Sequence, residues 1–191
     1  MLPHRKSVRH YHDLGDCREL TFSCYQRLPL LTSELFRRKL CEAMHRAMVN
    51  HRYRHIAFVL MPDHTHLFVY PLPDASAISD LLYAIKRPFS YRIKKLLEEA
   101  NDPLLKKLTI RERPGKNSFR FWQEGPGYDR NIRTVRGSKN VVDYFHLNPV
   151  RRGLVAKACE WKWSSARWYE SDGSEIDPDL PAIDGLPWEH F

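Results

Sequence analysis

Two histidines that flank a single threonine, in the run LMPDHTHLFVYP (60–71), are the residues of this chain best suited to binding a metal ion. Alternate side chains of a β-strand point to the same face, so His64 and His66 would project together, with Thr65 on the opposite side. Two imidazoles placed in this way can hold one metal ion. An H-x-H pair also occurs on the solvent face of ordinary surface strands, and the pair alone does not decide between the two interpretations.

A second set of chemically capable residues lies in SKNVVDYFHLNPVRRGLV (138–155). Tyr144 and Asn148 are four residues apart, which places them on one face of a helix. If that helix lies over the strand of the histidines, the Asn148 amide oxygen completes a site of two imidazoles and one oxygen with open coordination positions. A scissile phosphate can fill these positions. Tyr144 would then attack phosphorus and leave a phosphotyrosine-linked strand end and a free 3′-hydroxyl.

The sequence pattern predicts strands and helices that could position these residues. Strands are predicted at 19–25, 55–61, 64–71 and 119–123, and helices at 32–51, 76–100 and 138–147. Pro88 is expected to kink or divide the second helix. Ser138 is the expected N-cap of the third helix, and Pro149 should end it at Asn148, because proline disfavours helical dihedrals in the residue before it.

The order of these elements predicts an α+β fold. Our preferred version is a ferredoxin-like, split-βαβ antiparallel sheet with helices packed on one face. Residues 1–14 are expected to form a polar leader, 15–170 a single catalytic domain, and 171–191 an acidic, proline-rich C-terminal tail. The segment 101–118 is expected to be a loop.

The charge balance favours a nucleic-acid partner. The 191 residues include 31 Lys and Arg against 23 Asp and Glu, for a net charge of +8, and basic residues often stand beside aromatic ones, as in RPFSYRIKK. Cations neutralise phosphates and aromatic rings stack on bases. A basic composition is by itself also compatible with a mere solubility trait.

Neither the cysteines nor the apolar segments indicate a secreted or membrane protein. The four cysteines are scattered without C-x-x-C spacing, which favours reduced structural thiols. No apolar run approaches the roughly 20 residues that span a bilayer, and the first residues lack a signal-peptide pattern. We therefore expect a cytoplasmic protein with no membrane partner.

These motifs together resemble a known family. MPDHTHLFVYP resembles the HUH motif of the IS200-like single-tyrosine transposases, and FWQEGPGYDRNIR followed by DYFHLNPVRRGLV resembles the C-terminal half of the REP-associated tyrosine transposases. By this resemblance His64 and His66 are metal ligands, Tyr144 is the catalytic tyrosine, and Asn148 supplies a third ligand. The resemblance also implies Mg²⁺ or Mn²⁺ as cofactor. It implies a substrate of single-stranded DNA with a REP-like hairpin, a nucleoid-associated location, and a monomer or homodimer.

Two departures from the family pattern leave alternatives open. Thr65 replaces the usual bulky apolar residue between the histidines. Pro149 follows Asn148 directly and can take its backbone out of the helix. Asp63 and His146 are the alternative third ligands, although in ideal geometry each would face away from the site.

Other residues could share in the function. Tyr128, in the glycine-flanked run GPGYDRNIR, is an alternative nucleophile or a base-stacking residue. Nine basic residues are expected to contact DNA phosphates, and they are Lys86, Arg87, Arg92, Lys94, Lys95, Arg130, Arg133, Arg151 and Arg152.

The function predicted from the sequence is that of a metal-dependent single-stranded DNA endonuclease and strand transferase of the transposase type, which acts through a 5′-phosphotyrosine intermediate. Two alternatives remain on the same scaffold. One is a non-catalytic regulator that binds nucleic-acid hairpins, and the other is a metal phosphodiesterase that uses water in place of the tyrosine.

Overall fold

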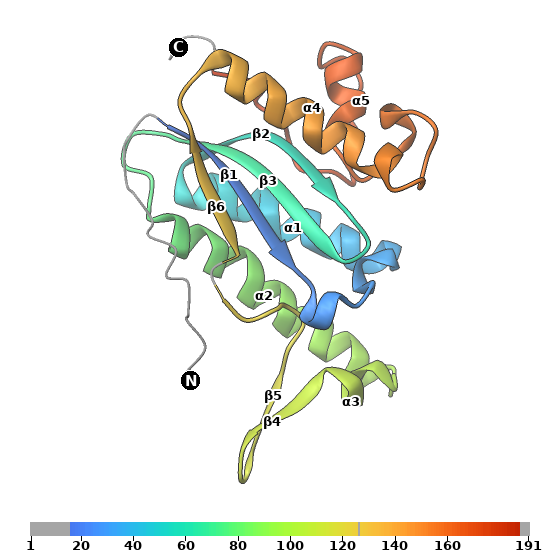
Figure 1. The fold of residues 1–191 in the computed structure, drawn as a ribbon. Coiled ribbons are helices and arrows are strands. Elements are labelled where there is room, and N and C mark those ends of the chain that lie inside the picture. Colours follow the sequence, from blue (N-terminus) through green and yellow to red (C-terminus); the bar gives the residue numbers. More distant parts are fainter. Residues whose placement is uncertain (1–15, 126, 188–191) are drawn as a thin grey trace, which may run out of the picture.

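A computed structural model describes residues 16–125 and 127–187, which fold around a four-stranded antiparallel sheet (Figure 1). The spatial order of the strands is β2-β3-β1-β6. Their bounds are β1 (Cys17–Ser23), β2 (Tyr53–Leu60), β3 (His64–Pro71) and β6 (Tyr128–Ile132). This order, with its two helical crossovers, confirms the ferredoxin-like prediction. The predicted leader, 1–14, lies outside the described residues.

Helices cover both faces of the sheet (Figure 1). The two crossover helices, α1 (Glu34–His51) and α2 (Ile78–Glu99), share one face, as predicted. They bury the larger core, which includes Leu20 and Leu67 of the sheet. A third long helix, α4 (Val135–Arg151), covers the other face over a smaller, separate core.

Local sequence explains where α1 begins and ends. The Ser33 side chain accepts a hydrogen bond from the backbone N–H of Phe36, which satisfies one free donor of the first turn. Arg52 ends the helix in a left-handed conformation, with φ of 59°. The next strand starts at once, so the following β2–β3 hairpin is placed directly beside α1.

The structure contradicts the predicted division of α2 at Pro88 and the predicted end of α4 at Pro149. Pro88 lies inside α2, which stays continuous, and Pro149 lies inside α4 rather than beyond its end. Each proline removes one backbone hydrogen bond, but buried side chains on both sides of Pro88 hold the helix to the core. The N-cap of α4 is also earlier than predicted. The Thr134 side chain accepts from the N–H of Gly137, and Ser138 lies within the helix.

The segment between α2 and α4 differs most from the prediction. The expected loop 101–118 contains a short helix and most of a two-stranded hairpin, with bounds α3 (Leu104–Leu108), β4 (Thr109–Arg113) and β5 (Lys116–Phe119). The expected strand 119–123 is not a strand of the main sheet, because only Trp122 forms an isolated bridge, to Cys24. The fourth strand is instead β6, which the sequence analysis missed.

The C-terminal segment packs back on the edge strand β2. Ser164 forms a bridge with Val59 after η3 (Ala158–Glu160), and α5 (Ala166–Glu170) follows. Further along, the N–H of Asp184 donates to the His55 carbonyl, while the N–H of His55 donates to the Asp184 carboxylate. The segment therefore occupies a free edge of the sheet, which would otherwise expose unpaired backbone groups.

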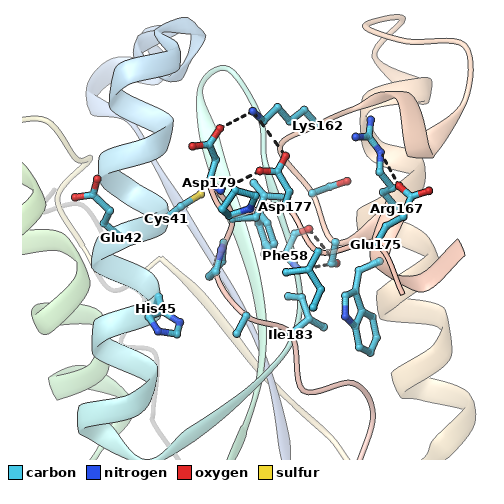
Figure 2. Close-up of a pocket in the computed structure, with 18 of the residues that line it drawn as sticks. Cys41, Glu42, His45, Phe58, Lys162, Arg167, Glu175, Asp177, Asp179 and Ile183 are labelled. Carbon is cyan, nitrogen blue, oxygen red and sulfur yellow. Dashed lines mark hydrogen bonds and ion pairs between the residues drawn. The ribbon is translucent and has the colours of Figure 1, made fainter. Parts of the chain in front are cut away.

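This segment also borders an open pocket of about 900 Å³ between itself, α1 and β2 (Figure 2). Figure 2 shows Lys162 at its rim, where the ammonium lies 2.7 Å from Asp179 and 3.7 Å from Asp177. These ion pairs join two parts of the C-terminal segment, and Arg38 of α1, 2.8 Å from Asp179, fastens the segment to the helix. No helix among the described residues is both long enough and apolar enough to cross a membrane.

The buried His55 gives a prediction on pH dependence. Burial lowers the pKa of His55 to about 3, so between pH 6.5 and 3 the unfolded chain binds a proton that the folded chain does not. The free energy of unfolding should therefore fall with decreasing pH, by up to about 1.4 kcal/mol per pH unit from this residue. Urea unfolding at several pH values should show that the free energy of unfolding falls less steeply with decreasing pH in His55→Phe than in the wild-type protein. The exposed His45→Phe is the control, and equal slopes in all three proteins would contradict the assignment.

Candidate active site

The two histidines of β3 lie side by side on the face that α4 covers. Their Nε2 atoms are 3.1 Å apart, and the residues are only 4% and 5% exposed. Thr65 points to the other face, as strand alternation requires, and is fully buried there. The predicted common orientation of His64 and His66 is present in the structure.

The other nitrogen of each ring is held by a neighbouring side chain. The His64 Nδ1 lies 2.7 Å from an oxygen of Asp63, and the His66 Nδ1 lies 2.7 Å from Thr21 Oγ1 across the β1–β3 pair. A carboxylate can only accept, so His64 donates from Nδ1 and keeps a lone pair on Nε2. Asp63 thus contacts the nitrogen remote from the site and orients the ring, as partners of metal-binding histidines do.

The helix α4 places the predicted nucleophile and third ligand next to His66. The Asn148 side-chain amide lies 3.1 Å from His66 Nε2, and the ring centres of Tyr144 and His66 are 5.6 Å apart. Phe145, the residue after Tyr144, stacks on the His66 ring, with the two ring centres 5.0 Å apart. Because the helix continues through Pro149, Asn148 keeps its helical position one turn after Tyr144.

The electrostatics keep both imidazoles neutral. Burial lowers the pKa of His64, although the adjacent Asp63 opposes this effect. Burial, followed by the neighbouring His64, lowers the pKa of His66 to about 3. The pKa of Asp63 is also lowered, since hydrogen bonds from His64 and Arg27 outweigh its partial burial. Neutral imidazole is the form that binds metals.

The donor set fits a divalent cation. Among the described residues no three His, Cys, Asp or Glu side chains gather around one point, so the set consists of two imidazoles and the Asn148 amide. The ligand atoms of an octahedral ion lie roughly 2.1 Å from the metal, so two adjacent ligand atoms are about 3 Å apart. This spacing matches the two 3.1 Å distances from His66 Nε2, to His64 Nε2 and to the Asn148 amide. Turning the Asn148 amide by a half rotation presents its oxygen instead of its nitrogen.

Tyr144 itself is accessible. Its side chain is 41% exposed, and no described residue forms a hydrogen bond with its hydroxyl group. The guanidinium of Arg151 lies over its ring, 5.5 Å from the ring centre. A cation in this position stabilises negative charge that develops on the phenol oxygen.

The alternative residues lie elsewhere. His146 faces away from the site, and its Nε2 pairs with Ser165 Oγ at 2.9 Å. Tyr128 is the first residue of β6, opposite Thr21, so Thr21 separates it from His66. It is 47% exposed on the same face of the sheet as the histidines.

The predicted DNA-contacting residues lie in three places, which are the end of α4, the strand β6 with the residue after it, and the helix α2. Arg151 and Arg152 end α4 beside Tyr144, while Arg130 and Arg133 lie on and after β6, where they pair with Glu19 at 2.6 Å and Asp16 at 2.8 Å. The other five lie on α2, across the sheet from α4, and they are Lys86, Arg87, Arg92, Lys94 and Lys95.

Within the α2 group the environments differ. Lys86 lies 4.7 Å from the centre of the Phe22 ring, and burial lowers its pKa to about 8. Lys94 and Lys95 both pair with Glu98, at 3.4 and 2.8 Å. Arg87 and Arg92 are exposed.

Two contributors to the site were missed in the sequence. Thr21 carried no signal, because its role depends on the pairing of β1 with β3. Arg27 pairs with Asp63 at 3.3 Å from a turn, η1 (Tyr25–Arg27), in which it has a φ of 56° and Gln26 a φ of 51°. Two consecutive left-handed residues other than glycine are strained. This strain lies directly beside the candidate site.

Comparison with known proteins gives concordant matches. Residues 18–111 match the family model described as "Transposase IS200 like". A curated protein of Haemophilus influenzae, named as a REP-associated tyrosine transposase, is 30% identical over 129 residues. The match covers 65% of this chain and 64% of that protein, so the chain spans just under two thirds of this relative. The fold is similar to a REP-associated tyrosine transposase solved with a bound REP hairpin, with a TM-score of 0.67, 21% identity and coverage of 95% and 93% of the two chains.

Proposed function

We propose that this chain, which matches the IS200-like transposase model over residues 18–111 and is similar to a REP-associated tyrosine transposase, cleaves and rejoins single-stranded DNA beside a hairpin, with Tyr144 as the nucleophile. One observation carries the proposal. Tyr144 and Asn148 of α4 meet His64 and His66 of β3, although the two elements are far apart in sequence.

The two histidines and Asn148 would hold a divalent metal ion, Mg²⁺ or Mn²⁺. Such an ion polarises a phosphoryl oxygen and stabilises charge on the leaving oxygen. Asp63 and Thr21 hold the two imidazoles with their Nε2 atoms toward the site. His64 presents its Nε2 lone pair to the site, and His66 would do the same when its Nδ1 donates to Thr21 Oγ1.

Tyr144 would attack the scissile phosphorus through its hydroxyl oxygen. The new bond joins this oxygen to phosphorus, the bond to the 3′ oxygen breaks, and the 3′ oxygen takes up a proton. The exposed hydroxyl of Tyr144 can release its own proton to water. Arg151 would stabilise the developing phenolate from its place over the ring. The phosphotyrosine ester keeps the energy of the broken phosphodiester, so a 3′-hydroxyl can reverse the step and join strands.

Basic residues near Tyr144 would hold the DNA. Arg151 and Arg152 follow Tyr144 at the C-terminal end of α4, and Arg27 pairs with Asp63, the residue before His64. Tyr128 offers an exposed ring for base stacking on the same face. A hairpin is the proposed recognition element because the related solved protein is bound to one.

A single experiment tests this proposal. Single-stranded DNA that carries a hairpin and an internal radiolabelled phosphate is incubated with the protein and Mn²⁺, then run on a denaturing gel. Label that migrates with the protein is the expected result. Cleavage without such an adduct would favour a hydrolytic phosphodiesterase, and binding without cleavage would favour a regulator.

A further inference from the structure

The hairpin of β4 and β5 stands apart from the rest of the molecule. Figure 1 shows it projecting away from the main sheet, and its two strands form a sheet of their own. Residues 111–117 are all exposed. Pro114 and Gly115 form its two-residue turn, and Gly115 has a φ of 78° that favours glycine. A two-stranded hairpin of this length gains little stability from itself, so its value to the protein must lie in what it contacts.

The hairpin carries uncompensated positive charge. Arg111 and Arg113 form no ion pair with any residue that the structure describes. The single acidic residue of the hairpin, Glu112, is already engaged by Lys116 at 3.0 Å and by Arg120 at 2.7 Å. Exposed Lys106 and Lys107 of α3 add to the charge at the base of the hairpin.

The base of the hairpin is fastened to the active-site end of the main sheet. The N–H of Tyr25 donates to the Phe121 carbonyl, and the N–H of Gln123 donates to the Ser23 carbonyl, both at 2.8 Å. Ser23 is the residue of β1 that pairs with His64. The buried ring of Phe121 packs edge-on against Phe89 of α2, with ring centres 4.7 Å apart, and makes this root rigid.

We propose that the β4–β5 hairpin binds the sugar-phosphate backbone of the duplex stem of a DNA hairpin while the single-stranded flank enters the site at His64 and His66. This inference rests on the proposed function. A two-stranded β-ribbon fits the major groove of a duplex. A strand of five residues is about 16 Å long, which equals the rise of about five base pairs. The protein hairpin can therefore contact a stem that starts close to the active site.

The test compares three DNA ligands, which are the flank with its hairpin, the flank alone, and the stem alone as a duplex. The double variant Arg111→Ala/Arg113→Ala is expected to bind the first and third ligands roughly tenfold more weakly and the flank alone unchanged. The slope of log affinity against log salt should become shallower by about two, because two phosphate contacts are lost. Fluorescence anisotropy between about 50 and 200 mM salt measures both quantities.

Controls separate this inference from the proposed function. The double variant Arg46→Ala/Arg167→Ala removes two exposed arginines elsewhere and should leave all three affinities unchanged. The variant Arg111→Lys/Arg113→Lys should retain most of the stem affinity, since a phosphate accepts either cation, whereas a base-reading arginine is not replaced by lysine.

Each remaining outcome has one meaning. If the wild-type protein binds the hairpin ligand no better than the flank, the hairpin substrate of the proposed function is wrong. If it prefers the hairpin ligand but the Arg111→Ala/Arg113→Ala variant keeps that preference, only the assignment of the β4–β5 hairpin is overturned. An equal loss on all three ligands would also overturn contact with the stem.

Discussion

Replacing Tyr144 by phenylalanine is expected to abolish the covalent protein–DNA adduct and to lower DNA cleavage by roughly 10³-fold or more. The substitution removes only the hydroxyl oxygen that would form the bond to phosphorus. The ring keeps its packing against His66 and its place under Arg151. Because no described residue bonds to the hydroxyl, the free energy of unfolding should change by less than about 0.5 kcal/mol. Gel analysis of labelled DNA and thermal unfolding measure the two effects.

Tyr128→Phe is the matched control for the nucleophile. It removes the hydroxyl of the other exposed tyrosine on the same face of the sheet, and the adduct should form as in the wild-type protein. Loss of the adduct in Tyr128→Phe together with its survival in Tyr144→Phe would show that Tyr128 of β6 is the nucleophile. Cleavage that survives in both variants would exclude a tyrosine mechanism at this site.

Removing one imidazole of the pair should have the second large effect. His66→Ala is expected to abolish cleavage in Mn²⁺ and to weaken Mn²⁺ binding by tenfold or more, because a ligand is lost and Asn148 loses its neighbour. His64→Ala should act in the same way. Calorimetric titration with Mn²⁺ measures binding without DNA, and cleavage by the wild-type protein should stop with a chelator and return with added Mn²⁺.

Buried histidines also support the fold, so further variants are needed. His66→Gln keeps a polar side chain of similar length and should restore stability without restoring cleavage. His45→Ala removes an exposed histidine of α1 and should bind Mn²⁺ like the wild-type protein. Mn²⁺ binding that is equal in His64→Ala, His66→Ala and the wild-type protein would contradict the metal site. So would full cleavage in the presence of the chelator.

A useful part of the site followed from local rules. The alternation of a strand placed His64 and His66 on one face, and the period of a helix placed Tyr144 and Asn148 on another. Both rules hold because they depend only on the backbone geometry of one element. That the two elements face each other was only a condition in the sequence analysis, because the predicted fold placed the helices on one face of the sheet, whereas α4 covers the face opposite α1 and α2.

The partners across the sheet could not be predicted in the same way. Thr21 contacts His66 only because β1 pairs with β3 in one particular register, and the sequence alone does not fix that register. The proline rule failed at Pro149 for a related reason. Packing of the buried Asn148 and Pro149 against the sheet outweighs the one lost hydrogen bond.

Short polar strands were the other failure. The strand β6 has five residues, of which only Ile132 is buried, so it shows no apolar alternation. The β4–β5 hairpin gave a clear turn signal in Pro114 and Gly115, but its exposed flanks carry charged residues and no apolar alternation that would have marked two strands.

The two separate cores on opposite faces of the sheet have a thermodynamic consequence for the nucleophile. The apolar contacts of α4 with the sheet belong to the smaller core, whereas α1 and α2 share the larger one. We therefore expect α4 to undock from the sheet at a lower free-energy cost than α1 or α2. A ligand that binds both His66 and Asn148 favours the docked state by mass action. Metal and nucleophile would then be coupled, and Tyr144 would be presented to DNA mainly by molecules that already hold the ion.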